Sequence, residues 1–324
     1  MKKLIAIIMA ALLLVSMTAC GNAGAEQKAG SKYVIGICQL ITHDALDAAT
    51  EGFKQAVIDQ LGEENVTFKF QNAAGDSNTC ATIVNTFVSD DVDLIMANAT
   101  PALQAAATAT ADIPILGTSV TEYGVALGID NFSGTVGTNV SGTSDLAPLD
   151  QQAQMIKDWF PDAKNVGLLY CSAEANSKYQ IDVVEAELTE LGYTCTRYSF
   201  TDTNDMQAVV EDAAANSDVI YVPTDNAVAN ATGIVDNICR PAGVPVIAGE
   251  SGICSGCGVA TLSIDYYDLG YATGLMAAKI LKGEAKISEM PIEYTPAEKI
   301  TPKYNAEICE ALELTPLEGY APLG

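Results

Sequence analysis

The chain has 324 residues, a formal net charge of −25 and a single histidine. Such an acidic composition excludes the basic footprint that nucleic-acid binding requires, and it disfavours unaided adsorption to anionic lipid. The charge alone does not select a ligand, because acidity also keeps a protein soluble.

The first 19 residues have the pattern of an export signal. Lys2 and Lys3 precede an apolar run over residues 4–15, which is shorter than the roughly 20 apolar residues of a membrane-spanning helix. The following Met17-Thr18-Ala19-Cys20 resembles a bacterial lipobox, in which the cysteine becomes the lipidated first residue. We expect residues 1–19 to be a signal peptide, Cys20 to carry a lipid at the outer face of the cell membrane, and residues 20–32 to include a flexible tether. The alternative is ordinary secretion with Cys20 unmodified or removed.

The rest of the chain contains one pattern of apolar runs and helical segments twice. Gly36 and Gly167 lie at equivalent points of the two copies, and so do Pro114 and Pro245; both pairs are 131 residues apart. Strands alternating with helices indicate parallel sheets, and a copy of more than a hundred residues is too long for a solenoid repeat. The sequence therefore predicts an α/β fold of two similar lobes, each a parallel sheet flanked by helices.

The segment after the second copy does not repeat the pattern a third time. We interpret it, together with residues 139–145, as chain that crosses between the lobes and forms a three-strand hinge. Lobe one is then expected to comprise residues 33–141 and 265–290, and lobe two residues 142–264 and 291–324.

Polar residues follow almost every predicted strand. In open α/β sheets, ligands bind beyond the carboxyl ends of the strands, near helix N-termini. Taken alone, each polar residue is also an ordinary helix cap or turn residue, and only the doubled pattern indicates a small-molecule cleft between two lobes. The candidate ligand-binding residues are Gln39, His43, Thr100, Thr118, Ser119, Ser144, Asp145, Glu174, Asn176, Thr224, Asp225, Asn226 and Glu250.

Catalytic signatures are missing from the sequence. It contains no G-x-S-x-G motif, no P-loop and no G-x-G-x-x-G after a strand. The one close cysteine pair, Cys254 and Cys257, is either a loop disulfide or two free thiols, because a single histidine and no second pair argue against zinc. We therefore predict no catalytic residue, metal or cofactor. The enzyme alternative is a flavodoxin-like or racemase-like protein with Cys38 opposite Cys171.

Several segments carry a family resemblance. With the lipobox, they resemble the substrate-binding lipoproteins of ABC importers, and more narrowly the branch associated with tryptophan and tyrosine uptake. The segments include His43-Asp44-Ala45-Leu46-Asp47, Gly142-Thr143-Ser144-Asp145, Glu174-Ala175-Asn176-Ser177, Pro223-Thr224-Asp225-Asn226 and Asp265-Tyr266-Tyr267.

The resemblance implies a type I periplasmic-binding-protein fold and an aromatic amino acid as ligand (tryptophan, tyrosine or phenylalanine). We expect the protein to be a monomer and to pass this ligand to an ABC permease. A branched-chain amino acid, a nucleoside or another small metabolite is the alternative ligand. The stretch around Cys254 and Cys257 departs from the family pattern.

For an amino-acid ligand, we expect a division of roles among these residues. The hydroxyls of Thr100, Ser119 and Ser144 would bind the carboxylate, and Asp225 or Glu174 would bind the ammonium through charge-assisted hydrogen bonds. Asn176 and Asn226 would orient the ammonium, and candidates to stack on an aromatic ring are Tyr123, Phe132 and Tyr179.

Overall fold

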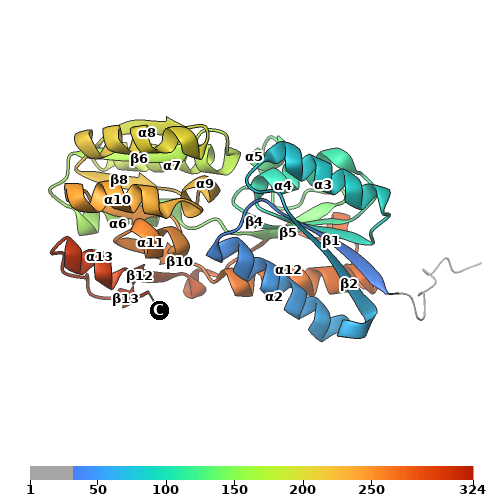
Figure 1. Cartoon of the computed structure of the whole chain (residues 1–324). Coiled ribbons are helices and arrows are strands. Elements are labelled where there is room, and N and C mark those ends of the chain that lie inside the picture. Colours follow the sequence, from blue (N-terminus) through green and yellow to red (C-terminus); the bar gives the residue numbers. More distant parts are fainter. Residues whose placement is uncertain (1–31, 324) are drawn as a thin grey trace, which may run out of the picture. The chain divides into compact units, whose positions relative to one another are not determined.

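The computed structural model of the protein describes residues 32–323. The predicted signal peptide, the predicted lipidation site Cys20 and nearly all of the predicted tether lie outside this range. Within it, no helix combines the length and the apolar character that crossing a membrane would require. The described chain contains two mostly parallel sheets flanked by helices, which confirms the predicted α/β fold of two lobes (Figure 1).

Lobe one is built on a six-stranded parallel sheet in the order β11-β5-β4-β3-β1-β2. Helices α3 and α4 cover one face of this sheet, and helices α2 and α12 cover the other. Strand β3 is therefore apolar from Leu94 to Ala97 and ends in the buried Asn98, because both of its faces are covered. The elements are β1 (Tyr33–Gln39), α2 (Asp44–Leu61), η1 (Glu63–Asn65), β2 (Val66–Asn72), α3 (Ser77–Ser89), β3 (Leu94–Asn98), α4 (Thr100–Ala109), β4 (Ile115–Val120), α5 (Tyr123–Leu127), β5 (Val140–Ser144), α12 (Tyr266–Leu281), η2 (Ile287–Glu289) and β11 (Glu293–Tyr294).

Helix α12 returns to lobe one after the chain has built most of lobe two, and it packs closely against α2. Glycines make this approach possible. A Cβ atom at Gly270 would lie 1.9 Å from the carbonyl oxygen of Ala49, and one at Gly52 would lie 2.1 Å from that of Tyr267. The two helix backbones are thus in direct contact, which fixes α12 and the crossing segment before it against lobe one.

Lobe two repeats the architecture. The order β4-β3-β1-β2 of lobe one recurs as β9-β8-β6-β7, which agrees with the duplication in the sequence. The full sheet has the order β13-β12-β10-β9-β8-β6-β7, and the pair β10–β12 is antiparallel. The elements are α6 (Leu149–Trp159), β6 (Asn165–Cys171), α7 (Ala175–Glu190), β7 (Thr194–Phe200), α8 (Thr203–Asn216), β8 (Val219–Val222), α9 (Asn226–Ala229), α10 (Thr232–Ala242), β9 (Val246–Ala248), α11 (Ser251–Cys257), β10 (Ala260–Ser263), η3 (Ala297–Lys299), β12 (Thr301–Tyr304), α13 (Ala306–Ala311) and β13 (Ala321–Pro322).

The lobe-one sheet continues past residues 141 and 290, where we expected lobe one to end. Strand β5 runs on to Ser144, and β11 pairs with it in parallel. The reason is local: Gly142 has a φ of +147°, and a Cβ there would lie 2.1 Å from the carbonyl oxygen of Gly117. A residue without a side chain lets β5 pair closely with β4 at the point where we expected only a hinge.

Candidate functional site

Three neighbouring strands of lobe one place polar side chains along one edge of the sheet. Thr100 opens α4 after β3, Ser119 lies near the end of β4, and Asp145 directly follows β5. Strand β4 lies between β3 and β5, and the Asp145 N–H donates to the Val120 carbonyl at 3.3 Å. The three side chains therefore come from adjacent strand ends, where ligands of α/β proteins bind.

Each of these side chains has a buried polar atom that lacks a hydrogen-bond partner within residues 32–323. The atoms are Thr100 Oγ1, Ser119 Oγ and Asp145 Oδ1, on residues that are 2%, 6% and 3% exposed. Buried polar groups are hydrogen-bonded in the great majority of cases, so three exceptions at one edge point to a ligand. The backbone agrees, since Ala99 and Ser119 have φ values of +89° and +53°, a strained region that often marks functional sites.

Asp145 combines burial with a negative charge. Its Oδ2 accepts a hydrogen bond from the Tyr266 hydroxyl at 3.0 Å. Burial raises the pKa of the carboxyl from 3.8 to about 6, while hydrogen bonds from Thr121 and Tyr266 oppose the rise. Among the ion pairs of the described chain, none includes Asp145. At neutral pH the site thus offers an ionised, buried carboxylate with one oxygen available to a cationic group.

Lobe two contributes a second cluster of polar residues, in which the carboxylates are already hydrogen-bonded. Glu174 Oε2 accepts from the side-chain nitrogens of Asn226, at 2.6 Å, and Asn176, at 3.1 Å. Asp225 accepts from the Cys171 N–H at 2.7 Å through Oδ2 and caps α9 through Oδ1. Burial raises the pKa of both carboxyls, and the charge of Asp225 raises that of Glu174 further. These acids mainly hold the ends of β6 and β8 together.

The side-chain oxygen of Asn176 is the atom of this cluster that can still accept a hydrogen bond. Its Nδ2 donates to Glu174 Oε2 and to the Thr224 carbonyl, both at 3.1 Å. These acceptors fix the orientation of the amide, because the opposite orientation would place an oxygen against two oxygens. The Oδ1 atom is buried, on a residue that is 4% exposed, and the described residues provide it with no donor.

Two polar contacts join the edges of the lobes. His43, at the start of α2, has its Nε2 3.2 Å from Asn226 Oδ1 in lobe two. Because Asn226 uses its nitrogen for Glu174, its oxygen must accept and His43 must donate. Tyr266, which binds Asp145, also interacts with the Thr224 side chain. A cavity of about 350 Å³ beside His43 is lined by residues of both lobes.

A second cavity, of about 820 Å³, lies around the crossing segments. Its wall includes Ile264, Tyr267, Pro296 and Lys299. Neither this cavity nor the one beside His43 is lined by any of the four residues with unpartnered atoms described above. We therefore place the candidate site by these atoms, at the strand ends that carry them.

Several predicted site residues stabilise the fold instead of facing the other lobe. Gln39 bonds to Asp47 at 2.6 Å and to Thr50 at 2.7 Å, which ties β1 to α2. The Thr118 hydroxyl meets that of Thr143 at 3.3 Å within the lobe-one interior. Ser144 Oγ donates to a backbone carbonyl at 2.8 Å and accepts from a backbone N–H at 3.1 Å, so its hydroxyl is already used.

Glu250, predicted to bind the ligand, and Tyr123, predicted to stack on its ring, also have structural roles. Glu250 caps α11 by accepting from the N–H groups of Gly252 and Ile253, and burial raises its pKa to about 7. Tyr123 is buried in the lobe-one core, with its hydroxyl donating to the Thr143 carbonyl at 3.0 Å. Its ring is therefore part of the core.

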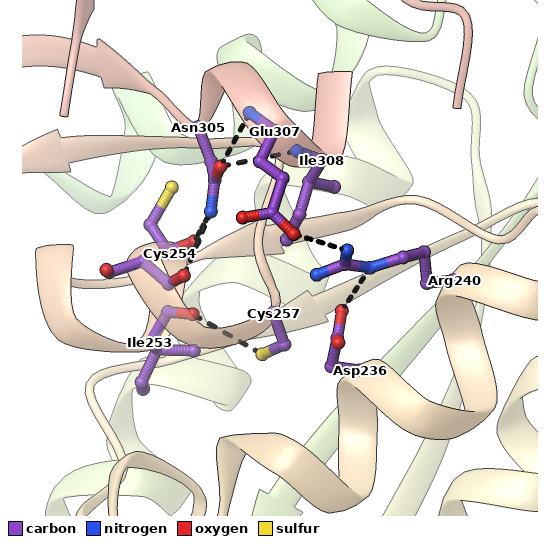
Figure 2. A network of polar contacts seen from close by, with 9 residues as sticks. Asp236, Arg240, Ile253, Cys254, Cys257, Asn305, Glu307 and Ile308 are labelled. Carbon is purple, nitrogen blue, oxygen red and sulfur yellow. Dashed lines mark hydrogen bonds and ion pairs between the residues drawn. The ribbon is translucent and has the colours of Figure 1, made fainter. Parts of the chain in front are cut away.

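The cysteine pair lies on helix α11 and not in a loop. Figure 2 shows the Cys257 thiol directed at the Ile253 carbonyl, and the Cys254 thiol donates to the Gly258 carbonyl. Both are buried free thiols, and the described residues contain no group of ligands that would hold a metal ion. Asn305 anchors the helix through the Cys254 carbonyl at 3.0 Å, which helps to position Glu250 at its start.

Sequence reasoning missed Tyr266 as a site residue. Its only signal was membership of the Asp265-Tyr266-Tyr267 segment. The left-handed backbone at Ala99 had no signal at all, since alanine is not a residue that favours positive φ.

Comparisons with known proteins agree on one family. The profile of the family described as ABC transporter substrate binding protein matches residues 34–315. A tyrosine-binding protein of Clostridioides difficile is 36% identical over 302 residues, which cover 90% of this chain and 87% of that protein. A domain from Streptococcus pneumoniae, solved in complex with L-Trp, is 30% identical, has a TM-score of 0.85, and covers 90% of this chain and 100% of its own.

Among the solved structures, similarity in sequence and similarity in structure do not follow the same order. The ligand-free, open structure of a Clostridium difficile substrate-binding protein with adhesive properties is 38% identical but has a TM-score of only 0.68, over 90% of this chain and 99% of its own. The L-Trp complex is less similar in sequence and more similar in structure.

Proposed function

The chain belongs to the family of ABC transporter substrate-binding proteins, and we propose that it captures an aromatic amino acid between its lobes. Proteins of this family are not enzymes; they bind a small molecule outside the cytoplasm and present it to an ABC permease. The proposal includes a lipid on Cys20 that keeps the protein at the outer face of the membrane, as a monomer.

One observation carries the amino-acid part of the proposal. Two hydroxyls and one carboxylate oxygen, all buried and all without a partner in the described chain, lie at adjacent strand ends. An amino acid has one anionic and one cationic group on the same carbon. Thr100 and Ser119, with the N-terminus of α4, suit the carboxylate, and Asp145 suits the ammonium.

The ammonium is assigned to Asp145 in place of Asp225 or Glu174, which sequence reasoning favoured. Both oxygens of Asp225 already accept backbone N–H groups, and Glu174 accepts from two asparagine side chains. A carboxylate whose lone pairs are occupied gains less from an ammonium than one with a free oxygen.

The aromatic class rests on the relatives. One is named for tyrosine and another was solved with L-Trp, and both share at least 30% identity over 90% of this chain. Branched-chain amino acids and nucleosides remain the comparison ligands in any test.

A thermal-shift screen over all amino acids and nucleosides tests the function. A ligand at 100 times its Kd stabilises the folded state by about 2.7 kcal/mol, which is a readily measured rise in Tm. We expect the aromatic amino acids to give the largest shifts. A shift with nucleosides or branched-chain amino acids, and none with aromatic ones, would reject the proposal. The anchor is tested separately, because Cys20→Ser should release the protein from cell envelopes into the medium.

A further inference from the structure

Asn176 Oδ1 is the one unpartnered buried polar atom among the lobe-two site residues. The same amide donates to Glu174 and to the Thr224 carbonyl, so its acceptor orientation is fixed by lobe two itself. No residue in the described chain donates to it. A ligand held in the cleft is therefore the expected source of the missing donor.

The order of strands indicates which part of an amino acid reaches this atom. In lobe one, the atoms assigned to the carboxylate and ammonium lie beyond β3, β4 and β5, and His43 lies beyond β1, the next strand along. Strands are about 4.8 Å apart, so the path from the end of β4 to the end of β1 is roughly 10 Å. This is a length that an aromatic amino acid can span.

The contact between His43 and Asn226 lies at the β1 end of this distance, next to the lobe-two cluster. His43 donates to Asn226, and Asn226 donates to the same Glu174 oxygen that receives the Asn176 amide. An amino acid whose carboxylate and ammonium groups lie at Thr100 and Asp145 would therefore direct its side chain toward Asn176. The side chain would point away from the strand ends that bind the two charged groups.

We infer that Asn176 Oδ1 accepts a hydrogen bond from the ring of the ligand, so that the protein selects aromatic amino acids with an O–H or N–H group on the ring over phenylalanine. The inference rests on the proposed function and deepens it. The phenol of tyrosine and the indole of tryptophan carry such a donor. Phenylalanine does not, and its capture would leave the acceptor buried and unpaired.

The surrounding charge strengthens this selection. Glu174 accepts from the Asn176 amide, and Asp225 is close enough to Glu174 to raise its pKa. Negative charge on this pair of acids favours a donor and disfavours an acceptor on the ligand. O-methyl-tyrosine, which keeps the ring oxygen but has no hydrogen on it, should therefore bind no better than phenylalanine.

Calorimetry with matched ligands tests the inference on the unaltered protein. The pairs are tyrosine against phenylalanine, and tryptophan against benzothienylalanine, in which sulfur replaces the indole N–H. We expect the member without a donor to bind about 10- to 100-fold more weakly in each pair. Equal affinities within both pairs would overturn the inference and leave the proposed function intact. Binding of no aromatic amino acid at all would instead reject the proposed function.

A pair of variants locates the effect. Asn176→Leu removes the acceptor, and Gln180→Leu is its matched control: the buried Gln180 side chain also donates to the Thr224 carbonyl, at 3.0 Å, but its own oxygen is already used by the Thr224 N–H. We expect the tyrosine-to-phenylalanine affinity ratio to fall toward one in Asn176→Leu and to stay unchanged in Gln180→Leu. An unchanged ratio in both variants, or an equal loss in both, would assign the selectivity elsewhere.

Discussion

Replacing Asp145 by asparagine should have opposite effects on stability and on ligand binding. In the arrangement of this structure with no ligand between the lobes, the ionised Asp145 carboxylate is buried and has one oxygen without a donor in the described chain. Asparagine has nearly the same shape and no charge. If the carboxylate serves the ligand and not the fold, the variant should be more stable and should bind amino acids more weakly.

The size of both effects follows from the pKa. Burial raises the pKa of Asp145 from 3.8 to about 6, and each pKa unit corresponds to about 1.36 kcal/mol. The charged form therefore destabilises the empty protein with Asp145 buried as in this structure by about 3 kcal/mol near pH 7. This is an upper limit for the folded state, because opening of the lobes hydrates the carboxylate, and the penalty disappears as the pH falls from about 6 toward 3.8. Loss of a buried partner for the ammonium costs about 2–5 kcal/mol of binding, or at least a roughly 30-fold rise in Kd.

Chemical denaturation and calorimetry on the ligand-free variant and wild type measure the two quantities. We expect a higher free energy of unfolding at pH 7, no such gain at pH 4, and a Kd for tyrosine raised at least about 30-fold. The Tyr266 hydroxyl still has an acceptor in asparagine, so its contact with residue 145 is a small correction. A variant that is less stable and binds normally would show that Asp145 is a structural residue, and would refute the reasoning.

Three other outcomes are expected. Below about pH 6, amino-acid affinity should fall roughly tenfold per pH unit as Asp145 is protonated, and calorimetry across pH 4–8 that shows no such fall would contradict its role. His43→Ala should weaken binding about fivefold by removing one hydrogen bond between the lobes, mainly through faster dissociation in stopped-flow measurements, whereas His43→Gln, which keeps a donor, should restore part of it. Gly270→Ala should lower stability by at least about 2 kcal/mol, because its Cβ would meet the Ala49 carbonyl, while Gly233→Ala, with nothing within 4 Å, should not lower it.

The duplicated sheets were predictable because their signal is redundant. Each lobe repeats the same alternation of apolar strand and helix, so an error in one element is corrected by its counterpart. The strand order β9-β8-β6-β7 could be anticipated from β4-β3-β1-β2 for this reason.

Helix α11 was not predictable in the same way. The helix contains Gly252 and Gly256, and Gly258 follows it, which favours a loop on propensity alone. In the structure, Glu250 caps its first turn, and Ile253, Cys254 and Cys257 are buried at helical spacing. Tertiary burial thus overrides the weak propensity of a seven-residue helix.

The roles of the acids show where sequence reasoning stops. Asp225 and Glu250 each stand directly before a helix, and both cap that helix in the structure. Asp145 stands four residues before α6, with Pro148 between, so it has no helix to cap. The sequence contained this distinction, since a capping residue must precede its helix immediately. It did not contain the direction of each side chain, which decides whether an oxygen remains free.

The same unpartnered atoms explain why closure should depend on ligand. Without one, closing the lobes buries the Asp145 carboxylate, the hydroxyls of Thr100 and Ser119, and the Asn176 oxygen away from water, and each loses its solvent partner. An amino acid that fills all four positions removes these penalties only in the closed form, while the open form leaves the groups hydrated. A ligand shifts a conformational equilibrium only by its differential affinity for the two states. The protein therefore selects ligands that remove the cost of burying these unpaired polar groups in the closed form. A molecule that lacks one of the charged groups or the ring donor would leave a penalty in place and would hold the lobes closed less well.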